Sequence, residues 1–241
     1  MTVTATSTPD DMVIDMADVR FRWPDTPSFE IHVDAFALRR GSRTLLLGPS
    51  GGGKSTLLSL MCGIVVPQTG RISVLGRDIK QLSSSARDRF RADHIGIIFQ
   101  MFNLLPYGTV IDNVILPLSF SASRRARAYR SDNGASEAMR LLRALQLSDV
   151  QCRSTPATLS VGQQQRVAVA RALIGAPEII VADEPTSALD KERQAGFLDL
   201  LFEQIAAAGA TLVMVSHDDT LAERFDQVLQ LGDVVEHVSR G

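Results

Sequence analysis

A glycine-rich segment carries the side chains whose types and spacing best fit a defined chemistry. It consists of Gly48, Pro49, Ser50, Gly51, Gly52, Gly53, Lys54, Ser55 and Thr56. Backbone N–H groups can turn inward around phosphate oxygens only where side chains are small or absent. Lys54 would add a charge for the β- and γ-phosphates, the Ser55 hydroxyl can ligate Mg²⁺, and Thr56 would reach a phosphate nearer the base. The segment therefore predicts a nucleotide site.

Two apolar runs frame this segment and would hold it in place. Residues 44–47 are typical of a buried strand, and residues 57–61 of a helix packed on that strand. The helix start near Lys54 would add its unpaired N–H groups and the positive end of its dipole. A chance glycine-rich turn has no need of this setting, so we expect a P-loop.

Two carboxylates follow another continuous apolar run, residues 179–182. A strand of this kind is buried on both faces, as in a parallel sheet, and delivers Asp183 and Glu184 to the edge where ligands bind. Asp183 can hold the magnesium shell, and Glu184 can act as general base on a water in line with the γ-phosphate. His217 ends the next buried run, where an imidazole can bond the γ-phosphate and orient that water; the alternative is a structural histidine.

Length, composition and charge limit the class of protein. The chain has 241 residues, of which 45% are hydrophobic and 22% charged, with a net charge of −2. These values suit one large α/β domain, with or without an inserted subdomain. The near-neutral charge gives no electrostatic case for a nucleic-acid partner. Cys62 and Cys152 lie far apart without cysteine or histidine neighbours, and we expect packing residues in a reducing compartment.

The chain shows no targeting signal. Residues 1–11 are polar, so we expect a disordered tail and no signal peptide. No apolar run reaches the roughly 18–20 residues that span a bilayer, so any membrane association would come through a partner. We therefore expect a cytoplasmic protein.

Three further features have both a functional and a structural interpretation. Trp23, the only tryptophan, can stack on an adenine ring or serve as a hydrophobic anchor. Gln100 ends a predicted strand at residues 95–99, where it can reach Mg²⁺ or a water, or simply end the strand. Residues 101–107, from Met101 to Tyr107, are rich in large apolar side chains, which favours a contact with another protein over a loop folded on its own subdomain.

A basic cluster lies between two predicted helices, residues 109–118 and 135–147. It contains Arg124, Arg125, Arg127 and Arg130. Such a cluster can face anionic lipid headgroups. We favour a solvated face instead.

Several motifs in register resemble the nucleotide-binding subunits of ATP-binding-cassette (ABC) transporters across nearly the whole chain. They are the P-loop, Leu159-Ser160-Val161-Gly162-Gln163-Gln164-Gln165-Arg166, Asp183-Glu184-Pro185 and Ser216-His217-Asp218. The resemblance implies an α/β fold with a RecA-like P-loop core, an N-terminal antiparallel β portion and a helical subdomain at about residues 101–157. Residues 12–241 would then form one ABC ATPase domain. Residues 98–106 and 113–118 are similar to the lipoprotein-release and macrolide-exporter branch.

The resemblance also implies partners and roles. Two subunits would pack head to tail as a homodimer, with Ser160, Gly162 and Gln163 of one closing over ATP on the other and Asp190 in a turn at the seam. The dimer would hydrolyse ATP with Glu184, His217 and Gln100 as catalytic residues, bind Mg²⁺ through Ser55, Gln100 and Asp183, and stack Trp23 on adenine. It would drive a separate membrane permease, contacted through residues 101–107, from the inner face of the membrane. The alternatives are a soluble ABC ATPase and a non-catalytic ATP-gated scaffold.

The chain departs from the family pattern at Val161, where the usual signature has glycine. A β-branched residue does not readily take a positive φ. Either residue 161 is extended in the fold, or closure of the dimer is weakened. We expect hydrolysis to survive because the other site residues are present.

Overall fold

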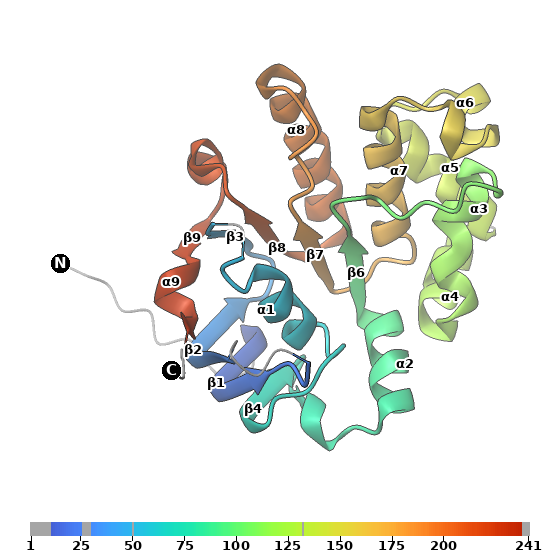
Figure 1. Cartoon of the computed structure of the whole chain (residues 1–241). Coiled ribbons are helices and arrows are strands. Elements are labelled where there is room, and N and C mark those ends of the chain that lie inside the picture. Colours follow the sequence, from blue (N-terminus) through green and yellow to red (C-terminus); the bar gives the residue numbers. More distant parts are fainter. Residues whose placement is uncertain (1–10, 26–29, 50, 132, 238–241) are drawn as a thin grey trace.

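Five parallel strands form the sheet on which the fold is built (Figure 1). The computed structural model describes residues 11–25, 30–49, 51–131 and 133–237, so that Ser50 and nearly all of the predicted N-terminal tail lie outside the described residues. The strand order is β6-β7-β8-β3-β9. The strands are β3 (Arg43–Leu47), β6 (Ile95–Ile98), β7 (Ile179–Asp183), β8 (Thr211–Ser216) and β9 (Gln227–Gln230).

Apolar side chains cover both faces of this parallel sheet. Leu45 and Ala182 belong to the hydrophobic core on one face, and Leu46 and Val181 to the core on the other. Alternate side chains of a strand point to opposite faces, so a strand buried on both sides is apolar at every position. This explains the apolar runs in β3, β7 and β8, whereas the edge strand β9 (QVLQ) is only partly buried and is not an apolar run.

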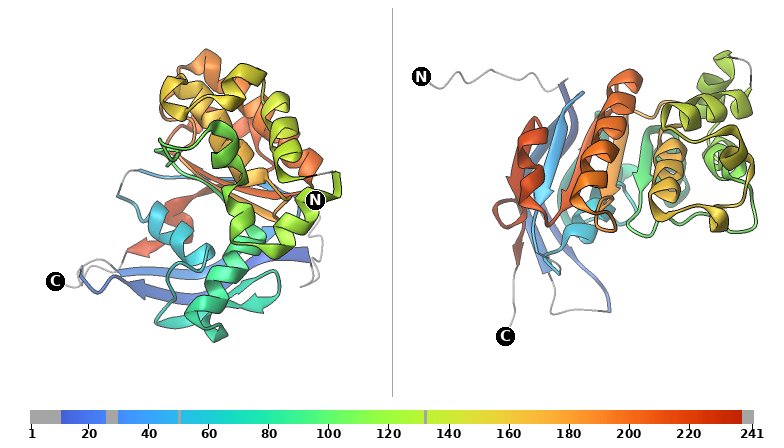
Figure 2. Two further views of the ribbon diagram at one scale, coloured as in Figure 1. Left: turned by 90° about the vertical axis from the view of Figure 1, so that its right-hand side faces the viewer. Right: turned by 90° about the horizontal axis from the view of Figure 1, so that it is seen from above.

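A second sheet, antiparallel throughout, lies across one face of the first, with helix α1 (Lys54–Met61) packed between them (Figures 1 and 2). Its order is β10-β2-β1-β4-β5. These strands are β1 (Met12–Arg22), β2 (Glu30–Arg39), β4 (Thr69–Val74), β5 (Arg77–Asp78) and β10 (Glu236–His237). In β2, Ile31, Val33, Phe36 and Leu38 are buried and their neighbours are partly or fully exposed, as expected for a strand with one face against the core.

Helices cover the opposite face and extend the molecule to one side, on the right in Figure 1. The parallel sheet packs against α7 (Val161–Leu173) and α8 (Lys191–Ala208). The lateral group consists of α3 (Val110–Ile115), α4 (Ala122–Ala128), α5 (Gly134–Ala144) and α6 (Asp149–Arg153). Helix α2 (Ser84–His94) leads into β6, and α9 (Leu231–Val234) follows β9.

Short 3-10 helices occupy several connections: Ile79–Gln81, Leu116–Ser119, Tyr129–Ser131, Pro156–Thr158 and Asp219–Arg224. The helix predicted at residues 109–118 is therefore α3 followed by a 3-10 turn, and Pro117 near its end has no N–H for an α-helical bond. The predicted class, an α/β P-loop fold with an antiparallel β portion and added helices, is confirmed. In the part of the chain that the structure describes, no helix is both long and apolar enough to cross a bilayer.

The solvated face predicted for the basic cluster is wrong for Arg124. This side chain is only 2% exposed, and its guanidinium donates hydrogen bonds to the carbonyl oxygens of Ile174 (2.8 Å) and Ala172 (2.8 Å). Burial lowers the pKa of Arg124 to about 10, which leaves it charged at neutral pH. It therefore satisfies the unpaired carbonyl groups at the C-terminal end of α7, where a cation also complements the helix dipole.

Close packing between β6 and α7 predicts a strong effect of one methyl group. A Cβ at Gly96 would lie 2.3 Å from the carbonyl oxygen of Ala172 and 2.6 Å from Cδ1 of Ile180. We expect Gly96→Ala to lower the free energy of unfolding by about 1–3 kcal/mol in urea titration, because the core has no room for the methyl group. In α8, a Cβ at Gly196 meets no heavy atom of the described residues within 4 Å. Gly196→Ala should therefore stabilise the chain by about 0.5–1 kcal/mol, and equal losses in both variants would contradict this packing.

Candidate functional site

A hollow of about 310 Å³ lies where β3 and β7 end, and it brings eight of the predicted site residues together. It is lined by Gly51, Gly53, Lys54, Ser55, Thr56, Gln100, Asp183 and Glu184. The P-loop and the two carboxylates meet there because parallel strands end at the same edge of the sheet.

The glycines of the loop are required by its backbone. Gly51 and Gly53 have φ values of 80° and 83°, in the left-handed region that residues with a Cβ rarely adopt. Gly53 immediately precedes α1, so the first N–H groups of this helix open into the hollow. At Gly48 a Cβ would lie 2.7 Å from the Cβ of Leu231, so a side chain cannot fit there. The backbone therefore presents its donors without intervening side chains.

Glu184 is held between two cationic or titratable partners. Its Oε1 lies 2.6 Å from Nζ of Lys54, and its Oε2 lies 3.0 Å from Nδ1 of His217. The residue is 8% exposed and has a φ of 43°, a backbone conformation that persists only where the surroundings enforce it. Strain of this kind concentrates at functional sites. His217 is thus brought to the hollow through its contact with Glu184.

The two carboxylates have pKa values displaced in opposite directions. Burial alone raises the pKa of Glu184, but the hydrogen bonds and positive charges of Lys54 and His217 outweigh burial and bring it below its ordinary value. Burial raises the pKa of Asp183; the Ser55 hydrogen bond opposes this increase and the charge of Glu184 adds to it. Glu184 is therefore an ionised carboxylate at neutral pH, the form that a general base requires.

The oxygen donors in the hollow fit a magnesium ion. Oγ of Ser55 donates a hydrogen bond of 3.2 Å to Oδ2 of Asp183, and Gln100 lines the same hollow. Hydroxyl, carboxylate and amide oxygens are the protein ligands that suit this hard cation. Binding of Mg²⁺ by these three residues remains a prediction.

Trp23 lies at the edge of the P-loop. Its Nε1 donates a hydrogen bond of 3.1 Å to Oγ1 of Thr56, and its ring packs edge-on against Phe21 with 5.1 Å between centroids. The indole is thus fixed beside the loop that precedes α1. Stacking on adenine remains a prediction.

The structure does not bring Ser160, Gly162 and Gln163 to the P-loop of the same chain. Within the described residues they line a separate hollow of about 980 Å³, together with Leu189. Ser160 begins α7 with a capping box, in which its Oγ accepts from the N–H of Gln163 and Oε1 of Gln163 accepts from the N–H of Ser160. Asp190 likewise caps α8 by accepting from the N–H of Arg193 at 2.9 Å.

Of the two alternatives expected for Val161, the extended backbone is wrong, and weakened closure of the dimer stays a prediction. Val161 is neither extended nor in need of a positive φ, because it is the first residue of α7. A β-branched residue costs little at this exposed first position, where no preceding helical turn crowds it. Its side chain is 49% exposed beside the N-terminus of α7. It can therefore contact only a molecule that packs against that end of the helix.

Comparison with known proteins identifies the family of this chain. The family model described as ABC transporter matches residues 31–187. The chain belongs to the ABC transporter family. It is 40% identical over 209 residues to the uncharacterised ABC transporter ATP-binding protein Rv0986 of Mycobacterium tuberculosis, an alignment covering 85% of this chain and 81% of the relative.

Two further relatives of this ABC cassette bear on its activity. The lipoprotein-releasing system ATP-binding protein LolD of Anaeromyxobacter dehalogenans is 42% identical over 193 residues, covering 80% of this chain and 78% of LolD. A dimeric post-hydrolysis state of the ATP-binding cassette MJ0796, bound to ADP and Pi, superimposes with a TM-score of 0.75 at 32% identity. That superposition covers 95% of this chain and 99% of MJ0796. The protein is an ATPase, as its sequence predicted.

The lowered pKa of Glu184 predicts a pH-dependent stability difference for Glu184→Gln. The fold stabilises the ionised carboxylate, so this contribution is complete above the ordinary value of 4.5 and is lost as pH falls through the lower folded value. Near pH 7 the variant should lose roughly 1–3 kcal/mol of unfolding free energy, because Lys54 and His217 lose a charged acceptor. The gap should narrow in urea titrations below pH 4.5. A gap that widened with acidification would contradict the sign of the shift.

Proposed function

We propose that this protein is the motor subunit of an ABC transporter that exports a substrate or extracts it from the membrane. The observation that carries the proposal is the ionised Glu184, held by Lys54 and His217 beside the P-loop. A scaffold that only binds ATP needs no carboxylate at this point. The names of relatives such as LolD support the export or extraction branch.

The same contacts suggest how hydrolysis proceeds. Nζ of Lys54 also donates 2.9 Å to the carbonyl oxygen of Gly48, and the γ-phosphate of ATP would compete with Glu184 for this ammonium group. A Glu184 carboxylate relieved of Lys54 can accept the proton of a water that attacks the γ-phosphate. His217, beside Glu184, would orient this water and bond the γ-phosphate. As the water attacks, its proton passes to Glu184, the bond from the γ-phosphorus to the oxygen bridging it to the β-phosphate breaks, and ADP leaves with that oxygen. Glu184 then releases its proton to solvent. Mg²⁺ held by Ser55, Gln100 and Asp183 would neutralise charge on the phosphates.

Dimerisation would complete the site. The N-terminus of α7 has N–H groups without intrahelical partners, which suits a phosphate. These groups and Ser160 belong to a hollow that lies apart from their own P-loop, so they can act only on ATP bound to a second copy. The dimeric MJ0796 structures support this arrangement. Gln163 and Asp190 would hold the helix starts that face the bound ATP, rather than contact it by their occupied side chains.

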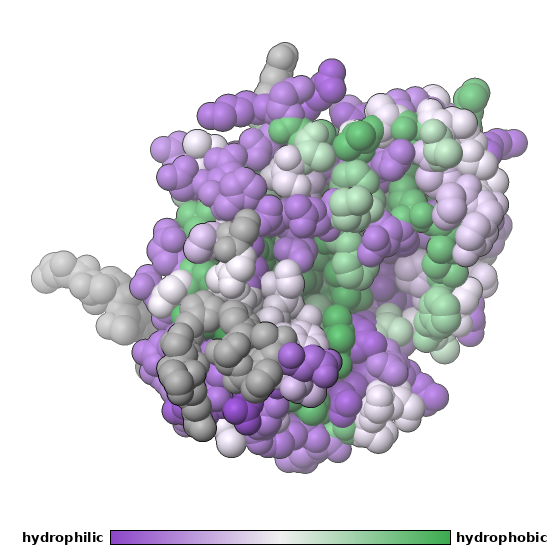
Figure 3. Space-filling view, in the orientation of Figure 1, coloured by the Kyte–Doolittle hydropathy of each residue, from purple (hydrophilic) through white to green (hydrophobic). Residues whose placement is uncertain are grey.

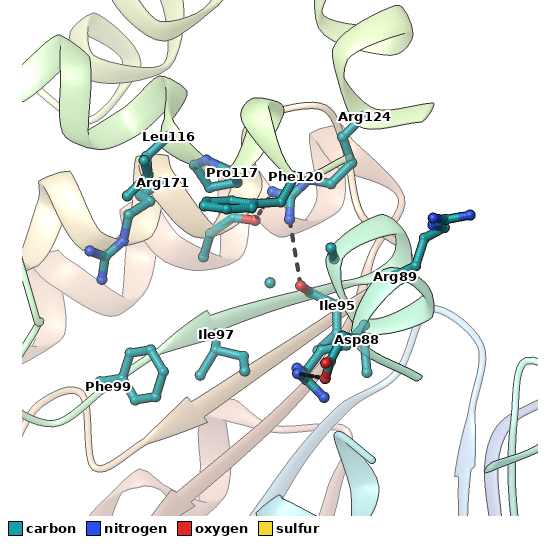
Figure 4. A pocket seen from close by; sticks show the side chains of 14 residues that line it. Asp88, Arg89, Ile95, Ile97, Phe99, Leu116, Pro117, Phe120, Arg124 and Arg171 are labelled. Atoms are coloured by element: carbon teal, nitrogen blue, oxygen red, sulfur yellow. Dashed lines mark hydrogen bonds and ion pairs between the residues drawn. The ribbon is translucent and has the colours of Figure 1, made fainter. Parts of the chain in front are cut away.

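An apolar groove of about 540 Å³ is the docking site that we propose for the permease (Figure 4). Ile97 and Phe99 lie on one side, and Pro117 and Phe120 face them from the other. Phe120 is 69% exposed, and Met101 and Tyr107 in the adjoining segment are exposed as well. Phe102, by contrast, is buried in the core, so residues 101–107 form a smaller surface than their composition predicts. Hydrophobic surface also gathers along the boundary of the helical group in Figure 3.

An apolar helix of a membrane permease, docked in this groove and against Met101 and Tyr107, would hold the cassette on the inner face of the membrane. A soluble ABC ATPase acting on nucleic acid or ribosomes is the alternative. The net charge of −2 does not favour nucleic acid as partner. Copurification can separate the two functions.

The role of Glu184 as general base predicts a trapped dimer. Glu184→Gln should lower ATP turnover by about 10²–10⁴-fold, because general-base catalysis is lost. Binding should persist and be visible as a change in the fluorescence of Trp23, the only tryptophan. Size-exclusion chromatography with Mg-ATP should then show a dimer, whereas the native protein returns to monomer after hydrolysis. Undiminished turnover would remove Glu184 from this role.

The groove predicts a separable loss of partner binding. A tagged Glu184→Gln protein should copurify with a multi-span membrane protein from detergent-solubilised membranes of its source cells. Adding Phe120→Asp should reduce that recovery at least about tenfold, because docking would bury an unpaired charge. Val150→Asp is the matched control, since Val150 is 80% exposed on α6 outside the groove. Recovery of ribosomes or nucleic acid instead would favour the soluble ATPase.

A further inference from the structure

The chain makes an unusual turn immediately after Gln100. Phe102 and Asn103 have φ values of 57° and 49°, so two consecutive residues with side chains lie in the left-handed region. The turn is closed by a hydrogen bond of 3.0 Å from the N–H of Phe102 to the carbonyl oxygen of Phe99. Such a backbone persists only where its surroundings over-determine it. Something outside the turn must therefore hold it.

The side chain of Arg171 holds the turn by hydrogen bonds. It belongs to α7, is 9% exposed, and inserts its guanidinium beneath the turn. Nη1 donates a hydrogen bond of 2.6 Å to the carbonyl oxygen of Asn103, and Nη2 donates to the carbonyl oxygen of Phe102. One planar fork thus binds both left-handed residues at once. A lysine offers a single point of attachment and cannot reproduce this geometry.

The far end of the segment is held separately. The side chain of the fully buried Asn113 accepts from the N–H of Leu105 at 2.6 Å and donates to the carbonyl oxygen of Leu105 at 3.1 Å. Leu105 lies beyond the turn, whereas Arg171 grips the two residues that follow Met101. The hydrogen bonds of Arg171 are therefore nearer along the chain to Gln100 than those of Asn113.

We propose that Arg171 is a positioning residue for hydrolysis: it fixes the turn that aims Gln100 into the P-loop hollow and joins that turn to α7. This inference rests on the role proposed for Gln100. Arg171 lies eleven residues along the chain from Ser160, roughly 16 Å up the helix at 1.5 Å per residue. A displacement of α7 imposed by the second copy of the dimer is thereby transmitted to the backbone beside Gln100. Without the guanidinium of Arg171, the turn at Phe102 and Asn103 is no longer held, and movement of α7 is no longer transmitted to it.

The first test is local and needs no nucleotide. Hydrogen–deuterium exchange of a peptide covering residues 100–104 should be faster in Arg171→Met and Arg171→Lys than in the native protein. The matched control is Arg124→Met, which removes another buried guanidinium. Within the described residues, Arg124 donates to the carbonyl oxygens of Ala172, Ile174 and Ile95 and not to this turn. This variant should lower the melting temperature and leave that peptide protected. Native exchange in Arg171→Met, or equal acceleration in Arg124→Met, would overturn the proposal.

The second test measures coupling to Gln100. Arg171→Met should lower kcat for ATP hydrolysis about 10- to 100-fold, as a misplacement of about 1 Å does, with the KM changed much less. In a double-mutant cycle with Gln100→Ala, the two losses should not multiply, because both remove the same placement. Fully multiplicative losses would overturn the proposal. If Gln100→Ala alone leaves kcat unchanged, the role proposed for Gln100 fails, while the exchange result still decides whether Arg171 holds the turn.

Discussion

Burial of both faces of the parallel sheet is the constraint on which the rest of this structure depends. A strand covered on each side can place polar groups only at its ends. The P-loop after β3, the carboxylates at the end of β7 and the imidazole after β8 therefore meet at one edge. The charged groups of the site lie at this edge because the interior of the sheet is filled almost entirely by apolar side chains.

At that edge, the contacts that stabilise the ionised form of Glu184 also reduce its strength as a base. Glu184 is buried with a left-handed backbone, and both features cost free energy. The contacts with Lys54 and His217 offset part of that cost and keep the carboxylate ionised. The same contacts make it a weaker base than a carboxylate free of cations. In the proposed mechanism, a phosphate that draws Lys54 away would restore the basicity of Glu184 only when nucleotide is bound.

The parts of this fold that could be predicted are those determined by local sequence. Apolar runs mark the central parallel strands β3, β7 and β8, and glycines at fixed spacing mark the phosphate loop. Val161 was also predictable in principle, because Ser160 and Gln163 form a capping box that starts a helix between them. The extended backbone predicted for Val161 was wrong because the family's glycine was taken to imply a positive φ.

Arg124 and Arg171 could not be assigned in this way. Their partners are backbone carbonyl oxygens, which every residue has, so no sequence pattern identifies the acceptor. Arg171 does leave one trace, since its position four residues after Val167 places a charge on the buried side of α7. A buried charge needs hydrogen-bond partners in the tertiary fold, but the sequence does not identify those partners. The roles of the site residues themselves stay predictions.

The position of β3 has a consequence for how the chain is made. This strand leads into the phosphate loop, and among the described strands it pairs with β8 and β9 alone, so that Leu45 lies opposite Met214 and Val228. Its partners are synthesised more than 160 residues later. During translation the loop emerges early but has no sheet to support it until β8 and β9 leave the ribosome. Nucleotide can therefore stabilise the chain only after β8 and β9 have been synthesised, and a chain interrupted before that point leaves the apolar strand β3 without its partners.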